Sequence, residues 1–316
     1  MEPALLELYA EGVPDDEVAV ILRLTDPAVI PDGVRIVARF GLIATSRVRR
    51  GDIPRLWAER SVESVKRPRP YGPTLDESQD LAEADVDLRP SDVRRPEGLR
   101  SRGKNVCVAH IDWGVDILHA DFRNEDGSTR LLALWDQAAP VDPNNPNPYG
   151  YGRIHRQADI NRALSAPDPY AALGYWPAAS DPAGIGSHGT HTLGISAGNG
   201  RSGGPVGLAP DADPIFVHFS TSTAEGPVLL GDSVAFLEAL DFIGKVADGR
   251  QLVINASLGR QCGQHDGQTL TERGMDAFLR ALVRRHRGGV LSGAELAREL
   301  RRLPGGPSAL RAMRIR

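Results

Sequence analysis

Apolar and polar residues alternate in short runs near the amino terminus of the chain. The run EVAVILRL from Glu17 has the alternation of a strand, and residues 34–49 have it over a length that fits one or two strands around a central glycine. The segment IPRLWAE indicates a short helix with Asp52 as its cap, and SVESVK from Ser61 indicates a closing strand. Residues 1–70 are therefore predicted to form a small α+β unit.

A different pattern begins further along the chain. Residues 71–102 are charged and punctuated by prolines without an apolar period, which is typical of a linker. Beyond them, the continuous apolar run VCVAHI is typical of a strand buried in a parallel sheet, PIFVHF and QLVINAS indicate further strands, and helical patterns open at SHGTH and at DSVAFLEALDFIGKV. Strands that alternate with helices predict an α/β domain, with a parallel sheet covered on both faces. Residues 124–182 are expected to form a polar, Pro- and Asn-rich excursion.

Composition limits the classes of protein to which this chain can belong. A chain of 316 residues with 41% hydrophobic content can form one large domain plus a small one, or two medium ones. The formal charge of -4 gives no basic field for nucleic acid, and no run approaches the roughly 18 apolar residues of a membrane span. The acidic amino terminus lacks the pattern of a secretory signal, so a cytoplasmic location is expected, with Cys107 and Cys262 as thiols rather than a disulfide.

One acid and two histidines are candidates for catalysis. Asp112 follows VCVAHI, and His188 and His191 lie in SHGTHTLG at the start of a predicted helix. Because the carboxyl ends of parallel strands gather at one edge of a sheet, Asp112 is placed to meet a histidine that opens a neighbouring helix. Such a pair would serve a hydroxyl nucleophile. Two alternatives remain. Asp112 could be a turn residue with no catalytic role, and the two histidines could bind a metal, although their spacing differs from that of the zinc motif HExxH.

Three segments follow one another in the order VCVAHIDWGVDILHADF, SHGTHTLGISAGNG and VINASLG. They resemble the aspartate motif, the histidine motif and the substrate-pairing strand of the subtilisin-like serine peptidases. The long connection between Asp112 and His188, with LLALWDQ and YGYGRIHRQADINRAL, and the later GQHDGQTL resemble more narrowly the spore-germination type of subtilase. The resemblance covers residues 103–287. It implies a three-layer subtilisin-like fold, a prodomain at residues 1–70 and an extended polypeptide substrate. It assigns Asp112 as the orienting acid, His188 as the general base, and the backbone of Ser257, Leu258 and Gly259 as the substrate rail.

The resemblance stops before two parts of the family's machinery. No asparagine follows Asn255 to donate to an oxyanion, and no Gly-Thr-Ser-Met-Ala motif carries a nucleophile. Ser308 follows Ser257 by too few residues to hold the strands that intervene in the family, and Ser292 fits no better. The subtilisin-like domain is therefore expected to be incomplete, and this chain alone to have negligible serine endopeptidase activity. The alternative is a non-catalytic, subtilase-like protein that binds peptides or regulates a partner.

The carboxyl-terminal residues change the composition abruptly. Residues 280–316 hold ten arginines, two glutamates and no lysine. Residues 288–316 are interpreted as an Arg-rich tail, either for an anionic partner or produced by a frameshift in G+C-rich DNA. No cofactor or metal is assigned: Asp121, in HADF, matches a position that ligates calcium in some relatives, but its co-ligands are not identified. The sequence does not set an oligomeric state.

Overall fold

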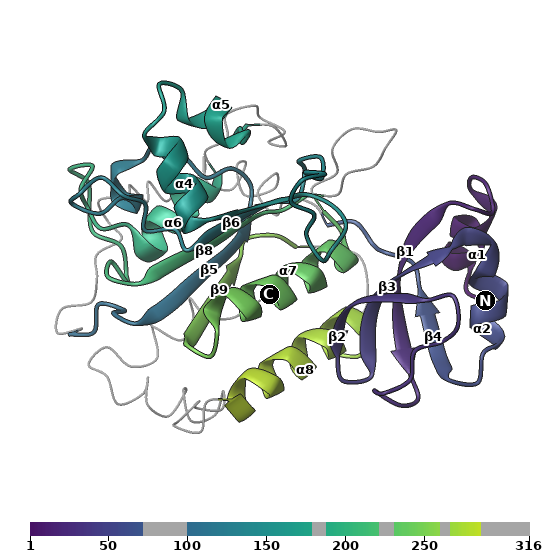
Figure 1. Cartoon of the computed structure of the whole chain (residues 1–316). Coiled ribbons are helices and arrows are strands. Elements are labelled where there is room, and N and C mark those ends of the chain that lie inside the picture. Colours follow the sequence, from purple (N-terminus) through teal and green to yellow (C-terminus); the bar gives the residue numbers. More distant parts are fainter. Residues whose placement is uncertain (72–99, 179–187, 221–230, 260–265, 286–316) are drawn as a thin grey trace, which may run out of the picture.

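The computed structural model describes residues 1–71, 100–178, 188–220, 231–259 and 266–285 (Figure 1). The predicted linker at residues 72–99, Cys262 and the Arg-rich tail lie outside these residues. Within the described part of the chain, every helix is too short or too polar to cross a lipid bilayer.

The amino-terminal residues form an antiparallel sheet with two helices on one of its faces (Figure 1). Its strands lie in the order β2-β3-β1-β4. The elements are α1 (Pro3–Ala10), β1 (Glu17–Leu24), β2 (Arg35–Phe40), β3 (Ile43–Arg49), the 3₁₀ turn η1 (Arg50–Asp52), α2 (Ile53–Ala58) and β4 (Val62–Lys66). The three strand-like runs therefore fold as their alternation predicts. A turn at Gly41, whose φ is +61°, separates β2 from β3.

This unit differs from the sequence prediction in two places. The sequence pattern did not predict α1, because its apolar residues are distributed around the helix instead of along one face, and only Leu5 is buried. Asp52 precedes α2 but does not cap it through its side chain. The reason is that η1 leads directly into the helix, so Asp52 has helical dihedral angles and not the extended ones of a capping residue.

The larger unit contains a five-stranded sheet in the order β7-β6-β8-β5-β9. Strands β6, β8, β5 and β9 are parallel, and β7 pairs antiparallel with β6. The elements are β5 (Val106–Asp112), η3 (Ala120–Phe122), β6 (Ala133–Asp136), β7 (Arg153–Arg156), α4 (Gln157–Leu164), α5 (Pro169–Leu173), α6 (His188–Ala197), β8 (Asp213–His218), α7 (Ser233–Ala247), β9 (Gln251–Ala256) and α8 (Leu270–Arg285). The α/β class is confirmed. The polar excursion is corrected, since residues 124–182 contain two strands and two helices whose apolar runs are too short to register in the sequence.

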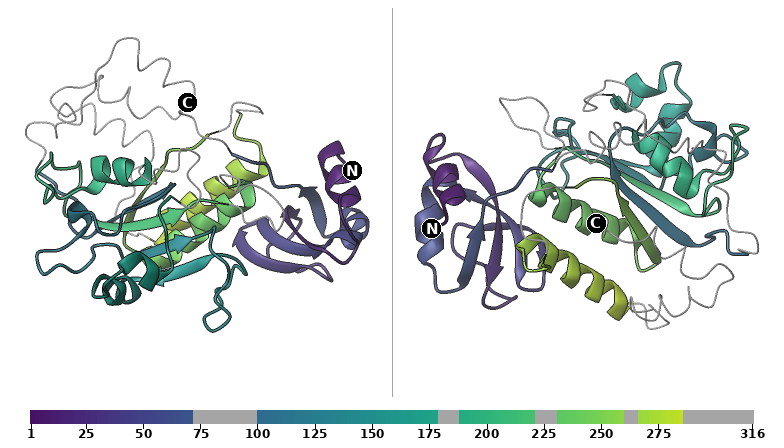
Figure 2. Two further views of the ribbon diagram at one scale, coloured as in Figure 1. Left: turned by 90° about the horizontal axis from the view of Figure 1, so that it is seen from above. Right: turned by 180° about the vertical axis from the view of Figure 1, so that it is seen from behind.

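Helices cover both faces of this sheet, as the three-layer expectation requires. Figures 1 and 2 show α7 and α8 on one face and α4 and α6 on the other. The alternation of β5 explains the division, because Ala109 and Ile111 join the core beneath α7 while Val108 joins the core beneath α6. His110 and Asp112 share the face of Val108, so the polar end of β5 points toward α6.

The free face of the amino-terminal sheet packs against α7 and α8 (Figure 1). Phe40 contacts Phe278 edge to face, with ring centroids 6.3 Å apart. Within this apolar contact, the two terminal guanidinium nitrogens of Arg47 on β3 donate to the carboxylate of Glu238 on α7, at 2.9 and 3.0 Å. The Glu238 side chain is fully buried, so the two units share a buried ion pair.

The segment after β4 continues the contact between the two units. Residues 69–71 form an antiparallel bridge with residues 231–233: Tyr71 N donates to Gly231 O and Ser233 N to Arg69 O, each at 3.0 Å. The Tyr71 ring lies against Phe219 and Phe236, with centroid distances of 6.0 and 5.6 Å. An extended segment of the amino-terminal unit is thus seated on the backbone that leads into α7.

Candidate active site

Asp112 is the last residue of β5, and its carboxylate is completely buried. Oδ1 accepts hydrogen bonds from Trp113 N at 2.7 Å and from His188 Nδ1 at 2.5 Å. Oδ2 accepts from the Thr192 hydroxyl at 2.8 Å. A buried carboxylate is stable only when such donors replace water, and here each of its oxygens has at least one.

His188 opens α6, and the backbone around it explains why it meets Asp112. After β5 the chain turns at Gly114, whose φ of +63° favours glycine. The loop then binds the start of α6, because Gly189 N donates to Trp113 O at 2.6 Å and Thr190 N donates to Gly114 O at 2.9 Å. A Cβ on Gly189 would lie 2.7 Å from both of those carbonyl oxygens and 2.4 Å from the Phe216 ring. Only glycine permits this approach of helix to loop.

The imidazole of His188 is suited to move a proton. Its Nδ1 bonds to the buried Asp112, so Nε2 is the ring nitrogen directed away from the carboxylate, and 22% of the side chain is exposed. The Trp113 ring lies beside it, with a centroid distance of 5.3 Å. A carboxylate behind an imidazole fixes its tautomer and stabilises the cation formed when the ring takes a proton. The pair can therefore serve as a general base.

The second histidine of the motif has a different environment. The sequence favours a role for His191 as a packed helix residue, but the structure shows it exposed. Among the residues that the structure describes, no three His, Cys, Asp or Glu side chains are grouped in a way that could hold a metal ion. The geometry therefore brings His188, and not His191, to Asp112.

The predicted substrate rail follows directly on β9. Ala256 pairs with Ile111 of β5, so Ser257, Leu258 and Gly259 continue past the edge of the sheet where Asp112 lies. The Ser257 hydroxyl accepts a hydrogen bond from Asn255 Nδ2 at 2.8 Å. Ser257 is therefore next in register to the acid, while the contact of these three residues with a substrate stays a prediction.

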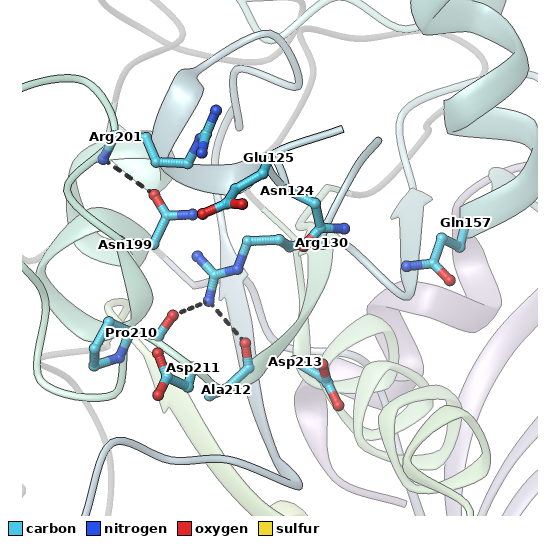
Figure 3. A pocket seen from close by; sticks show the side chains of 10 residues that line it. All are labelled: Asn124, Glu125, Arg130, Gln157, Asn199, Arg201, Pro210, Asp211, Ala212 and Asp213. Atoms are coloured by element: carbon cyan, nitrogen blue, oxygen red, sulfur yellow. Dashed lines mark hydrogen bonds between the residues drawn. The ribbon is translucent and has the colours of Figure 1, made fainter. Parts of the chain in front are cut away.

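A polar pocket of about 350 Å³ lies elsewhere in the domain (Figure 3). Its lining includes Asp213, the first residue of β8, so it opens at the amino-terminal edge of the sheet, opposite the edge of Asp112. Figure 3 shows the buried Arg130 guanidinium directed at the carbonyl groups of Pro210 and Ala212. It also donates to the carbonyls of Asp121 and Ala197. Burial lowers the pKa of Arg130, and these carbonyls together with nearby carboxylates compensate the cation.

Asp121 is the residue matched to a calcium ligand in some relatives. Its carboxylate accepts a hydrogen bond from within the chain. Its Oδ1 accepts from Ser202 N at 2.7 Å, and its carbonyl accepts from Arg130. One carboxylate oxygen and the main-chain carbonyl of Asp121 are thus used within the chain.

Similarity to known proteins identifies the family of this chain. The model of the subtilase family of peptidases matches residues 103–292. The chain belongs to the subtilase family. It is 25% identical over 243 residues to the PII-type proteinase of Lacticaseibacillus paracasei, an alignment that covers 72% of this chain and 11% of that protein. This subtilase chain thus spans about a ninth of the length of that relative.

Two solved structures resemble the subtilase chain. The CspB protease of Clostridium perfringens matches 58% of this chain and 35% of its own, with 22% identity and a TM-score of 0.44. The epidermin leader peptide processing serine protease EpiP of Staphylococcus aureus matches 85% of this chain and 57% of its own, with 12% identity and a TM-score of 0.42. Family membership supports serine-peptidase chemistry as the class of reaction.

Sequence reasoning missed one part of the subtilase site. Thr192 Oγ1 donates to Asp112 Oδ2 at 2.8 Å and lies 3.4 Å from His110 Nδ1. Two signals could have found them, since His110 precedes Asp112 by one strand period and Thr192 follows His188 by one helical turn.

Proposed function

We propose that this subtilase domain is a serine endopeptidase unit in which Asp112 is the orienting acid and His188 the general base. The observation that carries the proposal is the 2.5 Å hydrogen bond from His188 Nδ1 to a fully buried carboxylate. In the reaction, His188 Nε2 takes the proton of a hydroxyl that attacks a peptide carbonyl, and later returns it to the leaving amine. Asp112 holds the ring and stabilises its cationic form.

The proposed substrate is a polypeptide in extended conformation. Residues 231–233 already pair with an extended segment of the same chain, residues 69–71, through backbone hydrogen bonds. Main-chain pairing of this kind recognises a peptide largely irrespective of its sequence. Ser257, Leu258 and Gly259 are proposed to pair with the substrate from β9. Residues 1–70 are proposed to act as a prodomain, whose end pairs with residues 231–233 in the place of a substrate.

The proposed unit needs a nucleophile that these 316 residues do not provide in the family's motif. Loss of the nucleophile from a Ser-His-Asp constellation lowers the rate about a millionfold. We therefore propose that this polypeptide by itself hydrolyses peptide bonds negligibly, although its acid and base are in place.

A fluorophosphonate probe tests this proposal, because it modifies a serine whose proton is removed by an adjacent base. The 316-residue chain and its His188→Ala variant are incubated with the probe and analysed by peptide mass spectrometry. No serine is expected to be labelled in either protein. A serine labelled in the native chain and not in the variant would show that His188 serves a nucleophile within the chain, and would refute the incomplete site.

A non-catalytic peptide-binding protein is the second candidate function. The observation that favours it is the contact of the Tyr71 ring with the Phe219 and Phe236 rings, because this contact holds the extended segment in place and needs no catalytic group. Its test uses a fluorescent peptide Arg-Pro-Arg-Pro-Tyr, the sequence of residues 67–71, and a matched peptide that ends in alanine.

The Tyr71→Ala variant is expected to bind the tyrosine peptide more tightly than the native chain does, because the variant's own segment competes less. The alanine peptide is expected to bind more weakly to both. Equal binding of the two peptides would contradict a peptide site at this position.

A further inference from the structure

One face of α6 repeats polar side chains every four residues. His188, Thr192 and Ser196 lie one above another on this face, which is directed at β5. Four helical residues rise about 6 Å and two strand residues about 6.6 Å, so the spacing of these side chains matches that of Asp112 and His110. Two contacts result: Thr192 Oγ1 lies 2.8 Å from Asp112 Oδ2, and Ser196 Oγ lies 3.1 Å from His110 Nε2.

The proton positions follow from the partners of His110. Its side chain is fully buried, and burial lowers its pKa to about 4, so the ring is neutral near pH 7. Asn255 Nδ2, which can only donate, lies 3.3 Å from His110 Nδ1. The imidazole proton is therefore on Nε2 and is donated to Ser196 Oγ, whose own proton goes to the Thr192 carbonyl at 3.0 Å.

This arrangement directs the Thr192 hydroxyl toward the acid. Its proton has three acceptors within reach: Asp112 Oδ2 at 2.8 Å, the Gly189 carbonyl at 3.3 Å and His110 Nδ1 at 3.4 Å. The carboxylate is the nearest and carries the charge, so it takes the proton. The hydroxyl then holds Oδ2 while Oδ1 faces His188.

We propose that Thr192 is a positioning residue for the acid and base, and that the contact of His110 with Ser196 holds α6 in the register that this role requires. The proposal rests on the proposed function, since it gives Thr192 a role only where Asp112 and His188 act as a pair. Its direct consequence is a shorter-lived His188 to Asp112 hydrogen bond when the hydroxyl is removed.

The test is nuclear magnetic resonance of the 316-residue chain labelled with ¹⁵N-histidine. A proton held between an imidazole and a carboxylate resonates far downfield, and the native chain is expected to show this signal for His188 Nδ1. Thr192→Val replaces the hydroxyl by a methyl group of similar shape. It is expected to move the signal upfield and to speed exchange of the proton with water about tenfold, which is the loss of one hydrogen bond to a charged group. Thr192→Ser is expected to restore the native signal.

The outcomes separate this proposal from the proposed function. Absence of the downfield signal from the native chain would refute the pairing of Asp112 with His188 itself. An unchanged signal in a folded Thr192→Val variant would refute the role of Thr192 alone. If that variant does not fold, as judged by circular dichroism, the native chain still decides: His110 must carry its proton on Nε2, and a proton on Nδ1 would overturn the network.

Discussion

The buried pair of Arg47 and Glu238 gives a quantitative prediction about the contact between the two units. Burial by itself would lower the pKa of Arg47, but the charge and hydrogen bonds of Glu238 more than offset that effect and raise it. The Arg47 side chain is 12% exposed and that of Glu238 is fully buried, so solvent screens the pair very little. Arg47→Met keeps an unbranched apolar stem and leaves a buried carboxylate without its cation. The expected cost is about 3–5 kcal/mol of unfolding free energy.

The assay is urea denaturation of the 316-residue chain, followed by circular dichroism and tryptophan fluorescence. A second variant, Arg47→Met with Glu238→Leu, removes both charges and is expected to recover about 3 kcal/mol of the loss. Arg35→Met is the matched control, because Arg35 pairs with Glu17 at 2.7 Å on the same sheet but with both side chains about half exposed. That control is expected to cost less than about 0.5 kcal/mol.

The reasoning fails if Arg47→Met destabilises the chain no more than Arg35→Met does. It also fails if the double variant is as unstable as Arg47→Met, because the loss would then come from packing of the arginine stem and not from an uncompensated charge.

Three further predictions concern stability. Burial raises the pKa of Asp136 to about 6, so the stability that its carboxyl group contributes falls as pH rises from about 4 to 6. Asp136→Asn should therefore raise the unfolding free energy by about 2 kcal/mol at pH 7 in urea titrations, and leave it unchanged below about pH 4. Gly189→Ala should lower the unfolding free energy by about 2–3 kcal/mol, whereas Gly194→Ala on the same helix, with no atom within 4 Å of its added Cβ, should be neutral or stabilising by calorimetry. Arg130→Met leaves four carbonyl groups without their donor and should cost about 3–5 kcal/mol; an unfolding midpoint equal to the native one would contradict this.

The sheet of the larger unit was predictable because its central strands are buried on both faces. Such strands are largely apolar runs, and VCVAHI is followed directly by Asp112, the candidate acid of the site. Strands β6 and β7 have only four residues each, and their burial depends on neighbours that are distant in sequence. No local period marks such elements, so residues 124–182 looked like an excursion.

The residues of the candidate site likewise fall into those that the sequence marks and those that it does not. Asp112 and His188 were found because motifs mark them, but the partners of Asp112 other than His188 were not. Thr192 and His110 have sequence environments typical of any helix and any strand, and only the docking of α6 on β5 gives them a role. Arg47 and Glu238 are a stronger case, because charged residues in amphipathic elements are expected to face water until a second unit covers them.

The bridge between residues 69–71 and residues 231–233 also has a consequence for how binding is measured. A segment tethered to the same chain competes with any added peptide at an effective concentration on the order of millimolar. If residues 231–233 bind peptides as proposed, the apparent affinity of a free peptide would report the difference between its own binding and that of residues 69–71. The seating of the amino-terminal unit would then set how much peptide must be present before it binds.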